Sequence, residues 1–270
     1  MNKIGIIGIG MVGNAVKNYF EKKEVSLFLY DKKGIGSLEE VNKADIVFVC
    51  VPTPFVSGKG FDLSFVKDVC NSLKGEKIVV LKSTVIPGTT EKLQKEFPSF
   101  KFLFNPEFLS EKTAFKDMEN PDRQIVGYTS FSKDVAEKVL NLLPSSPFER
   151  IIPSSEAEMV KYFNNTFNAL KVTFANQMYD LCEKTGIDYN SVMEIAAKSK
   201  FIKTEDHLNI FHNDYRGFGG KCLLKDNRAL IEFAEKNGMD LKLHKMAEKI
   251  NEELMDLQKI DDPENFSQRT

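Results

Sequence analysis

The fold is decided by residues 3–13, which read KIGIIGIGMVG. Lys3–Ile7 has the short apolar run of a buried strand, and Gly8, Gly10 and Gly13 follow it with the spacing G-x-G-x-x-G. The next residues, NAVKNYF, are compatible with a helix. In this motif the first glycine makes a tight turn, the second lets a pyrophosphate approach the backbone, and the third lets helix pack on strand. The stretch therefore predicts a dinucleotide-binding strand–turn–helix unit.

A second apolar strand, Val25–Tyr30, is followed by Asp31, about 20 residues after the glycines. An acidic residue at this point accepts hydrogen bonds from the adenosine ribose hydroxyls and repels a 2′-phosphate. The pattern therefore predicts NAD, rather than NADP, as the cofactor. We also place Met11 and Val12, within the glycine-rich turn, among the cofactor contacts.

The length and charge of the chain suit an enzyme with a small-molecule substrate. Its 270 residues are enough for one large domain or two modest ones. The formal net charge is −2, so no general attraction to nucleic acid or to an anionic membrane is expected. The longest apolar runs are no longer than strands, and no membrane span is expected.

The cysteines and histidines do not suggest a metal site. Cys50, Cys70, Cys182 and Cys222 have no paired or metal-like spacing, so reduced thiols and a cytoplasmic location are expected. The three histidines are scattered along the chain, at His207, His212 and His244.

Strands alternate with helices through residue 150, which predicts an NAD-binding Rossmann domain of the α/β class over residues 1–150. Further strands are expected in four apolar runs, at 46–51, 78–81, 102–104 and 124–127. Ligands of open α/β sheets bind outside the carboxyl ends of the strands. The loops there are rich in proline, serine and threonine, and we place three of their residues in contact with the cofactor: Val51, Thr53 and Thr84.

The second half of the chain has a different character. Pro144–Ser155, with its prolines and serines, is expected at the domain boundary. An all-helical domain is expected over residues 151–260, followed by a polar tail at 261–270. Its helical patterns cover 156–184, 188–200, 223–236 and 241–260. The first of these has more apolar positions than one small sheet face needs, which predicts a homodimer.

A second informative segment is GFGGKCLLKD, residues 217–226. Small residues precede the thiol of Cys222, and Lys225 and Asp226 follow three and four residues later. If a helix begins near Cys222, both side chains lie one turn away on its face, and Lys225 with the helix N-terminus would lower the thiol pKa. The segment alone is equally compatible with a nucleophile and with a structural cysteine.

Together these motifs resemble the UDP-glucose/GDP-mannose dehydrogenase family, whose members oxidise the C6 alcohol of a nucleotide sugar to a carboxylate with two NAD. The most specific are the cysteine segment and the NPEFL motif at residues 105–109. The matching stretches run in family order through nearly the whole chain: 8–13, 51–54, 82–89, 105–111, 120–123, 156–166 and 217–226.

The resemblance implies a role for each matching polar residue. Cys222 would be the nucleophile, and Asp226 would act with a water as base. Lys161 and Asn165, one turn apart on a helix, would hold the C6 oxygen and stabilise charge on it. Glu111 would be the acid and base of thioester hydrolysis.

The resemblance also implies several ligand contacts. Thr84 would bind a water near the nicotinamide, and Glu111 and Lys225 would join the cofactor contacts. Glu107 and Glu111 would lie one turn apart if their segment is helical. The substrate contacts would be Glu107, Phe108, Leu109, Lys161, Asn165, Asn213, Tyr215, Phe218 and Gly219.

The chain departs from the family pattern in two ways. Leu224 stands where the family usually has proline, a change that concerns loop shape. Family members usually have a third, α/β domain that helps to hold the nucleotide, and the sequence stops just after the helical pattern that would lead into it. We therefore expect this chain alone to bind nucleotide sugars weakly.

Three interpretations of function remain. The leading one is an NAD-dependent nucleotide-sugar 6-dehydrogenase, with UDP-glucose as the favoured substrate. The second is a two-electron dehydrogenase of the β-hydroxyacid type, which also uses a helical lysine and asparagine four residues apart but has no use for Cys222. The third is a non-catalytic NAD-binding dimeric scaffold, or a fragment that needs a partner chain.

Overall fold

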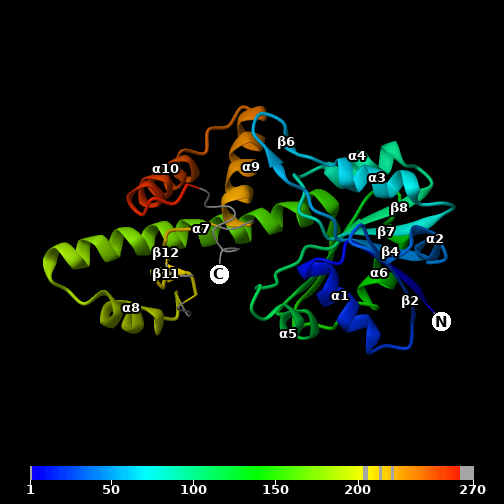
Figure 1. The fold of residues 1–270 in the computed structure, drawn as a ribbon, viewed down its shortest axis with the longest axis horizontal. Coiled ribbons are helices and arrows are strands. Elements are labelled where there is room, and N and C mark those ends of the chain that lie inside the picture. The colour runs from blue at the N-terminus through cyan, green and yellow to red at the C-terminus, as the bar shows by residue number, and fades with distance from the viewer. Residues whose placement is uncertain (1, 203–205, 213–214, 220–221, 262–270) are drawn as a thin grey trace. The chain divides into compact units, whose positions relative to one another are not determined.

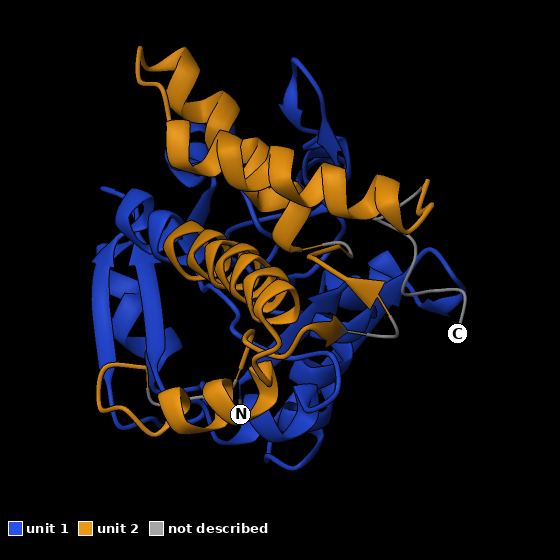
Figure 2. Cartoon of the chain, turned by 90° about the vertical axis from the view of Figure 1, so that its left-hand side faces the viewer, with its two compact units in different colours: residues 1–161 blue, residues 162–270 orange. Residues whose placement is uncertain are grey.

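The structure, a computed structural model, describes residues 2–202, 206–212, 215–219 and 222–261. The chain divides into two compact units, residues 1–161 and 162–270, which Figure 2 shows in different colours. The helix α7 (Ser154–Thr185) begins in the first unit and continues into the second.

Unit 1 is built on an eight-stranded sheet with the strand order β10-β9-β8-β7-β4-β1-β2-β3. Figure 1 labels four of these strands, β2, β4, β7 and β8. Neighbouring strands are parallel except for the pairs β8·β9 and β2·β3, so the predicted Rossmann-type α/β fold is confirmed. The strands are β1 (Lys3–Ile7), β2 (Ser26–Asp31), β3 (Ile35–Gly36), β4 (Ile46–Val49), β7 (Lys77–Leu81), β8 (Phe100–Phe104), β9 (Gln124–Tyr128) and β10 (Glu149–Pro153). A separate hairpin joins β5 (Phe55–Val56) to β6 (Gly60–Phe61).

The segment that we expected at the domain boundary, residues 144–155, lies within the first compact unit, which ends at residue 161. It contains β10, which pairs with β9 in parallel register from Glu149 opposite Gln124 to Pro153 opposite Tyr128. β10 is the edge strand of the sheet, where a proline is tolerated because no neighbour needs its missing N–H.

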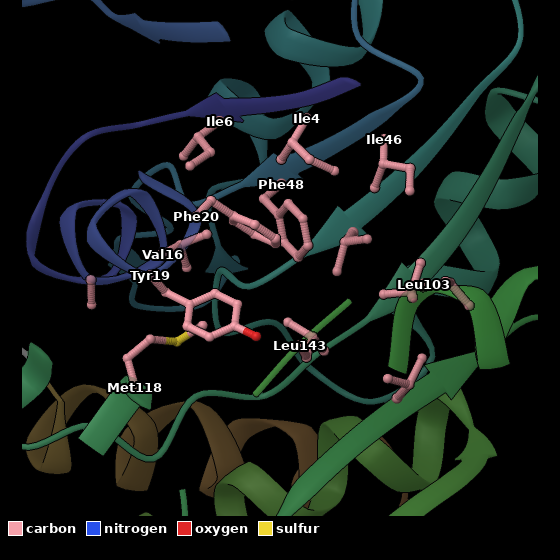
Figure 3. Close-up of a cluster of buried hydrophobic side chains, with 14 of the residues drawn as sticks. Ile4, Ile6, Val16, Tyr19, Phe20, Ile46, Phe48, Leu103, Met118 and Leu143 are labelled. Carbon is pink, nitrogen blue, oxygen red and sulfur yellow. The ribbon is translucent and has the colours of Figure 1, made fainter. Parts of the chain in front are cut away.

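Alternate residues of the central strands point to opposite faces of the sheet, as the two-residue period of a strand requires. Ile4 and Ile6 of β1 face one layer of helices, whereas Ile7 faces the other. The first layer, part of which Figure 3 shows, comprises α1 (Met11–Glu21), α5 (Ala114–Glu119) and α6 (Lys133–Leu140). The second comprises α2 (Leu38–Val41), α3 (Ser64–Ser72) and α4 (Thr89–Glu96). The inner strands are therefore mostly apolar, as in other sheets covered on both faces.

The strand order reverses at β1, which has β2 on one side and β4 on the other. In doubly wound sheets the crevice at this point is where ligands bind. The glycine-rich turn after β1, Asp31 at the end of β2 and Val51 after β4 all lie at this carboxyl edge.

Unit 2 contains the rest of α7, then α8 (Tyr189–Ala197), α9 (Leu223–Lys236) and α10 (Lys242–Leu257). The four predicted helices are present with small shifts at their ends. The unit is mainly, not entirely, helical, because β11 (Phe211–His212) and β12 (Tyr215–Arg216) form a short antiparallel pair. Such short strands leave no periodic pattern in the sequence.

Local sequence explains where α7 ends and where α8 begins. α7 stops before Gly186, which has a φ of 72°, and the Ile187 N–H donates to the Cys182 carbonyl at 2.9 Å. This left-handed glycine is a common helix stop. Asp188 then caps α8, since its carboxylate accepts hydrogen bonds from the backbone N–H groups of Asn190 and Ser191.

Among the described residues, none of the helices combines the length and apolar character that a membrane crossing requires.

Candidate active site

The glycine-rich turn has the shape of a phosphate cradle. A Cβ at Gly8, whose φ is 89°, would lie 2.8 Å from the Cys50 backbone, and one at Gly13 would lie 1.9 Å from the Gly8 carbonyl oxygen. Among the described residues, nothing lies within 4 Å of the corresponding position at Gly10. The first and third glycines therefore permit close packing within the protein, and the second leaves space on the side where a pyrophosphate would approach.

A cavity of about 300 Å³ opens beside this turn. Asp31 lines it, and the two carboxylate oxygens accept hydrogen bonds from the backbone N–H groups of Ile9 (2.7 Å) and Lys33 (2.8 Å). Asp31 thus holds the glycine-rich turn and also presents its charge to the cavity. Other lining residues come from β1, β2, the loop after β4, and α3: Ile7, Tyr30, Val51, Phe65, Asp68 and Val69. The cradle, the cavity and the acidic residue fit the adenosine half of NAD.

We expect NAD to bind at least about tenfold more tightly than NADP, because Asp31 would repel the 2′-phosphate. Asp31→Asn should narrow this preference, since Lys32 and Lys33 line the same cavity. Isothermal titration of NAD and of NADP measures the two dissociation constants whose ratio is this preference. Asp45→Asn, which changes an exposed carboxylate just before the start of β4, is the control. Tighter NADP binding to the unaltered protein would remove the role given to Asp31.

The loops after β4 and β7 are tied together by their hydroxyl groups. The Thr53 hydroxyl donates to the Thr84 carbonyl at 2.6 Å, and the Ser83 hydroxyl donates to the Val51 carbonyl at 2.6 Å. Three predicted cofactor contacts, Val51, Thr53 and Thr84, are therefore brought together at the carboxyl edge of the sheet.

Glu107 and Lys161 form a buried ion pair. The Lys161 ammonium donates to the Glu107 carbonyl (2.7 Å) and carboxylate (2.6 Å), and their side chains are 6% and 9% exposed. Burial tends to raise the pKa of Glu107, but the charge and hydrogen bond of Lys161 outweigh it, so the pKa is lower than usual. This pair joins the NPEFL segment to the first turns of α7.

The condition under which Glu107 and Glu111 would lie one helical turn apart is not met. Residues 105–110 form no helix, and Glu111 lies exposed in the turn that precedes α5. Pro106 disfavours helical backbone at the residue before it, and the Glu107 carboxylate bonds the Leu109 N–H at 3.0 Å. The Phe108 ring is covered by the Arg123 guanidinium, 3.9 Å from the ring centroid.

A second buried lysine, which the sequence did not single out, stands near Glu107. The Lys82 ammonium donates to the Asn105 side-chain oxygen at 2.6 Å, and the Asn105 amide donates to Gln124 and Ile125. Burial lowers the pKa of Lys82, and the charge of Glu107 acts in the opposite direction. The available signal was the position of Lys82 directly after a strand, at the start of a stretch that matches the family.

Glu158 is another buried polar residue that sequence reasoning missed. It is fully buried, and its carboxylate accepts hydrogen bonds from the Gly88 N–H (2.5 Å), the Thr90 N–H (2.8 Å) and the Thr90 hydroxyl (2.6 Å). Burial raises its pKa to about 7, although these hydrogen bonds oppose the rise. Glu158 thereby fastens α7 to the start of α4 and to the loop that carries Thr84.

Unit 2 contains a second polar cluster. The Asn165 amide donates to one oxygen of the Asp226 carboxylate at 2.6 Å, and the Lys225 ammonium lies 2.7 Å from the other. Asp226 is 1% exposed. Lys161 and Asn165 are one turn apart on α7, as predicted.

Cys222 immediately precedes α9, and its carbonyl accepts the Asp226 N–H at 3.0 Å. The helix that the sequence predicted here is confirmed. Cys222 is exposed, whereas Cys70 and Cys182 are buried, and burial raises the pKa of Cys50 and Cys70 to about 12. Cys222 is therefore the cysteine best placed to react.

The remaining predicted substrate contacts lie in the segment before Cys222. Tyr215 and Phe218 are buried and Gly219 is half-buried, while Asn213 lies outside the described residues. Within the described ranges, no group of three histidine, cysteine, aspartate or glutamate side chains could hold a metal ion.

Comparison with known proteins agrees with these motifs. Residues 35–142 match the NAD binding domain of the UDP-glucose/GDP-mannose dehydrogenase family, and residues 155–253 match the central domain of the same family. The chain is similar to a UDP-glucose 6-dehydrogenase of Rickettsia bellii, with 33% identity over 80% of this chain and 51% of that protein. A GDP-mannose 6-dehydrogenase of Pseudomonas putida is 30% identical over 71% of this chain and 47% of its own.

Among solved structures, a UDP-glucose dehydrogenase from the hyperthermophilic archaeon Pyrobaculum islandicum superposes with a TM-score of 0.82 at 28% identity. That match covers 94% of this chain and 68% of the other. The chain spans about half the length of the curated relatives it matches. With two consecutive domain matches to one family and NAD as the cofactor of the first domain, the chain belongs to the UDP-glucose/GDP-mannose dehydrogenase family.

Proposed function

We propose that this chain carries the NAD-binding and catalytic parts of a nucleotide-sugar 6-dehydrogenase that acts on UDP-glucose. The observation that best supports this is the thiol segment of unit 2, where exposed Cys222 precedes a helix whose Asp226 is bonded to Asn165. A family dehydrogenase without the thiol chemistry would not need a cysteine there.

In the first oxidation the C6 alcohol loses a proton and a hydride and becomes an aldehyde. Lys161 and Asn165 would hold the C6 oxygen and stabilise its developing negative charge. Asp226 would take the alcohol proton through a water, since its carboxylate already accepts hydrogen bonds at both oxygens. NAD, held by the glycine-rich turn and Asp31, supplies the hydride acceptor when bound.

The second oxidation needs the thiol because an aldehyde is a poor hydride donor. The Cys222 sulfur would add to C6, and the former carbonyl oxygen would take a proton, which gives a thiohemiacetal. Loss of a hydride from C6, for which a second NAD would be the acceptor, and of the hydroxyl proton then leaves a thioester. A water activated by Glu111 would attack the thioester, break the C6–S bond and release the carboxylate.

The β-hydroxyacid type of dehydrogenase is the second candidate, because it also uses a lysine and an asparagine one helical turn apart. Its reaction removes only two electrons and needs no covalent intermediate, so Cys222 would have no role in it.

GDP-mannose is an alternative substrate, since the family contains enzymes for both sugars. None of the four cysteines forms a disulfide, and we infer a reducing, cytoplasmic setting.

The test is to mix the purified protein with NAD and a panel of nucleotide sugars that includes UDP-glucose, GDP-mannose and UDP-N-acetylmannosamine. NADH formation with UDP-glucose at the highest kcat/KM supports the proposal. Preference for another nucleotide sugar would change the substrate only. Oxidation of a small β-hydroxyacid, with no nucleotide sugar turned over, would support the second candidate instead.

We further propose a homodimer formed through α7. A stripe of large apolar side chains is exposed along this helix at Phe163, Phe167, Phe174 and Leu181, and Phe163 is 74% exposed. Sedimentation at micromolar concentration should give a dimer, and Phe163→Asp combined with Phe174→Asp should shift it toward monomer. Phe131→Asp, at a 67% exposed site in unit 1, is the matched control. A monomeric unaltered protein would contradict the proposal.

A further inference from the structure

Arg216–Phe218, shortly before Cys222, is held by hydrogen bonds from two side-chain amides of the C-terminal helical region. We call this pair of contacts the grip. The Asn251 side-chain oxygen accepts the Phe218 N–H at 2.7 Å, and its amide donates to the Phe218 carbonyl at 2.8 Å. Gln258, which caps α10, does the same to Arg216, at 2.7 Å and 3.0 Å. A primary amide has both a donor and an acceptor, so each side chain can bond both the N–H and the C=O group of one backbone residue.

Gly217, between the two gripped residues, allows this close approach. Its φ is 94°, which favours glycine. A Cβ at this position would lie 2.6 Å from the Asn251 side-chain oxygen and 2.9 Å from the Met255 methyl carbon. Helix α10 therefore packs directly against the backbone of the segment.

Arg216 is held on its other side by α7. Its guanidinium group donates to the Asn176 side chain at 3.0 Å and to the Asp180 carboxylate at 2.6 Å, and lies 4.7 Å from the Tyr179 ring centroid. The segment is thus fixed between two helices. Asn251 is 2% exposed, so its hydrogen bonds are not shared with solvent.

We propose that Asn251 and Gln258 are positioning residues for Cys222. They hold Arg216–Phe218 in one conformation shortly before Cys222 in the chain, and α9 begins directly after Cys222, where the helix N-terminus favours a thiolate. The role of the thiol rests on the function proposed above. The grip itself does not, because it is a property of the folded segment that can be measured without turnover.

The experiment measures the rate at which iodoacetamide alkylates Cys222 across a pH series, with Cys222→Ala as the blank. Asn251→Ala should move the alkylation midpoint upward, toward the value of about 8.5 for an unperturbed thiol. Asn251→Asp keeps the size and the acceptor but replaces the donor with an oxygen that repels the Phe218 carbonyl, and should also move the midpoint upward. Asn237→Ala is the control, because Asn237 is exposed at the end of α9 and its side-chain amide donates to the Phe233 carbonyl of the same helix.

Asn251→Ala should also lower kcat by about tenfold or more, whereas the control should not. The Kd for NAD should stay within about twofold, since the cofactor cradle lies in unit 1. Gln258→Ala is a second variant at a half-buried helix end, and it keeps the test open if Asn251→Ala fails to fold. Folded Asn251→Ala and Gln258→Ala variants with the wild-type alkylation profile and kcat would overturn the positioning role. A different result would show that the proposed function is wrong, namely wild-type turnover of nucleotide sugar by Cys222→Ala.

Discussion

Replacing Cys222 with serine should lower the rate of carboxylate formation by about a thousandfold or more and leave NAD affinity unchanged. Serine has nearly the same size and could occupy the same position before α9. Its alkoxide, however, is far less available near neutral pH than a thiolate. The reaction should then stop at the aldehyde level, before the covalent intermediate that the second oxidation needs.

The measurement is the rate at which the best nucleotide sugar is converted to its C6 carboxylate, followed by mass spectrometry, together with the Kd for NAD. Cys182→Ala is the matched control, because Cys182 is buried near the end of α7 and its loss should affect stability rather than turnover. A Cys222→Ser protein that forms carboxylate at the wild-type rate would rule out covalent catalysis by this residue.

Substitution of Gly13 by alanine should abolish measurable NAD binding and lower the melting temperature. The new Cβ would stand 1.9 Å from the Gly8 carbonyl oxygen, a backbone atom that cannot move without opening the turn. Overpacking of this kind commonly costs about 1–3 kcal/mol, and here the strain falls on the cofactor cradle itself.

Gly10→Ala separates the two effects. Gly10 has a φ of −82°, which alanine tolerates, and its Cβ would meet no described atom within 4 Å. We therefore expect this variant to keep the wild-type melting temperature but to bind NAD weakly, because the methyl group occupies the space left for the pyrophosphate. Calorimetry and thermal unfolding of both variants test this, and wild-type NAD affinity in Gly13→Ala would contradict the cradle.

The sequence predicted those parts of the fold that depend on local patterns. The spacing of Gly8, Gly10 and Gly13 after an apolar run specifies a strand, a turn and a helix, and Asp31 marks the end of the second strand. The pattern around Cys222 correctly placed the start of α9. In each case the decisive residues lie within a few turns or one strand of each other.

The parts that could not be predicted depend on contacts between distant residues. Glu158 bonds Gly88 and Thr90 across 70 and 68 residues, and Asn251 bonds Phe218 across 33. A single polar residue in a helical pattern looks the same whether it faces water or a distant loop. The β10 strand was hidden for a related reason, because an edge strand tolerates the prolines and serines that usually indicate a linker.

The most direct test of the account is the number of NADH molecules formed for each molecule of nucleotide sugar consumed. The sugar is made limiting, NAD is supplied in excess, and the product is identified by mass spectrometry. Two hydride transfers through a Cys222 thioester predict two NADH and a C6 carboxylate. One NADH with a carbonyl product would show a single two-electron oxidation and would contradict the proposed mechanism.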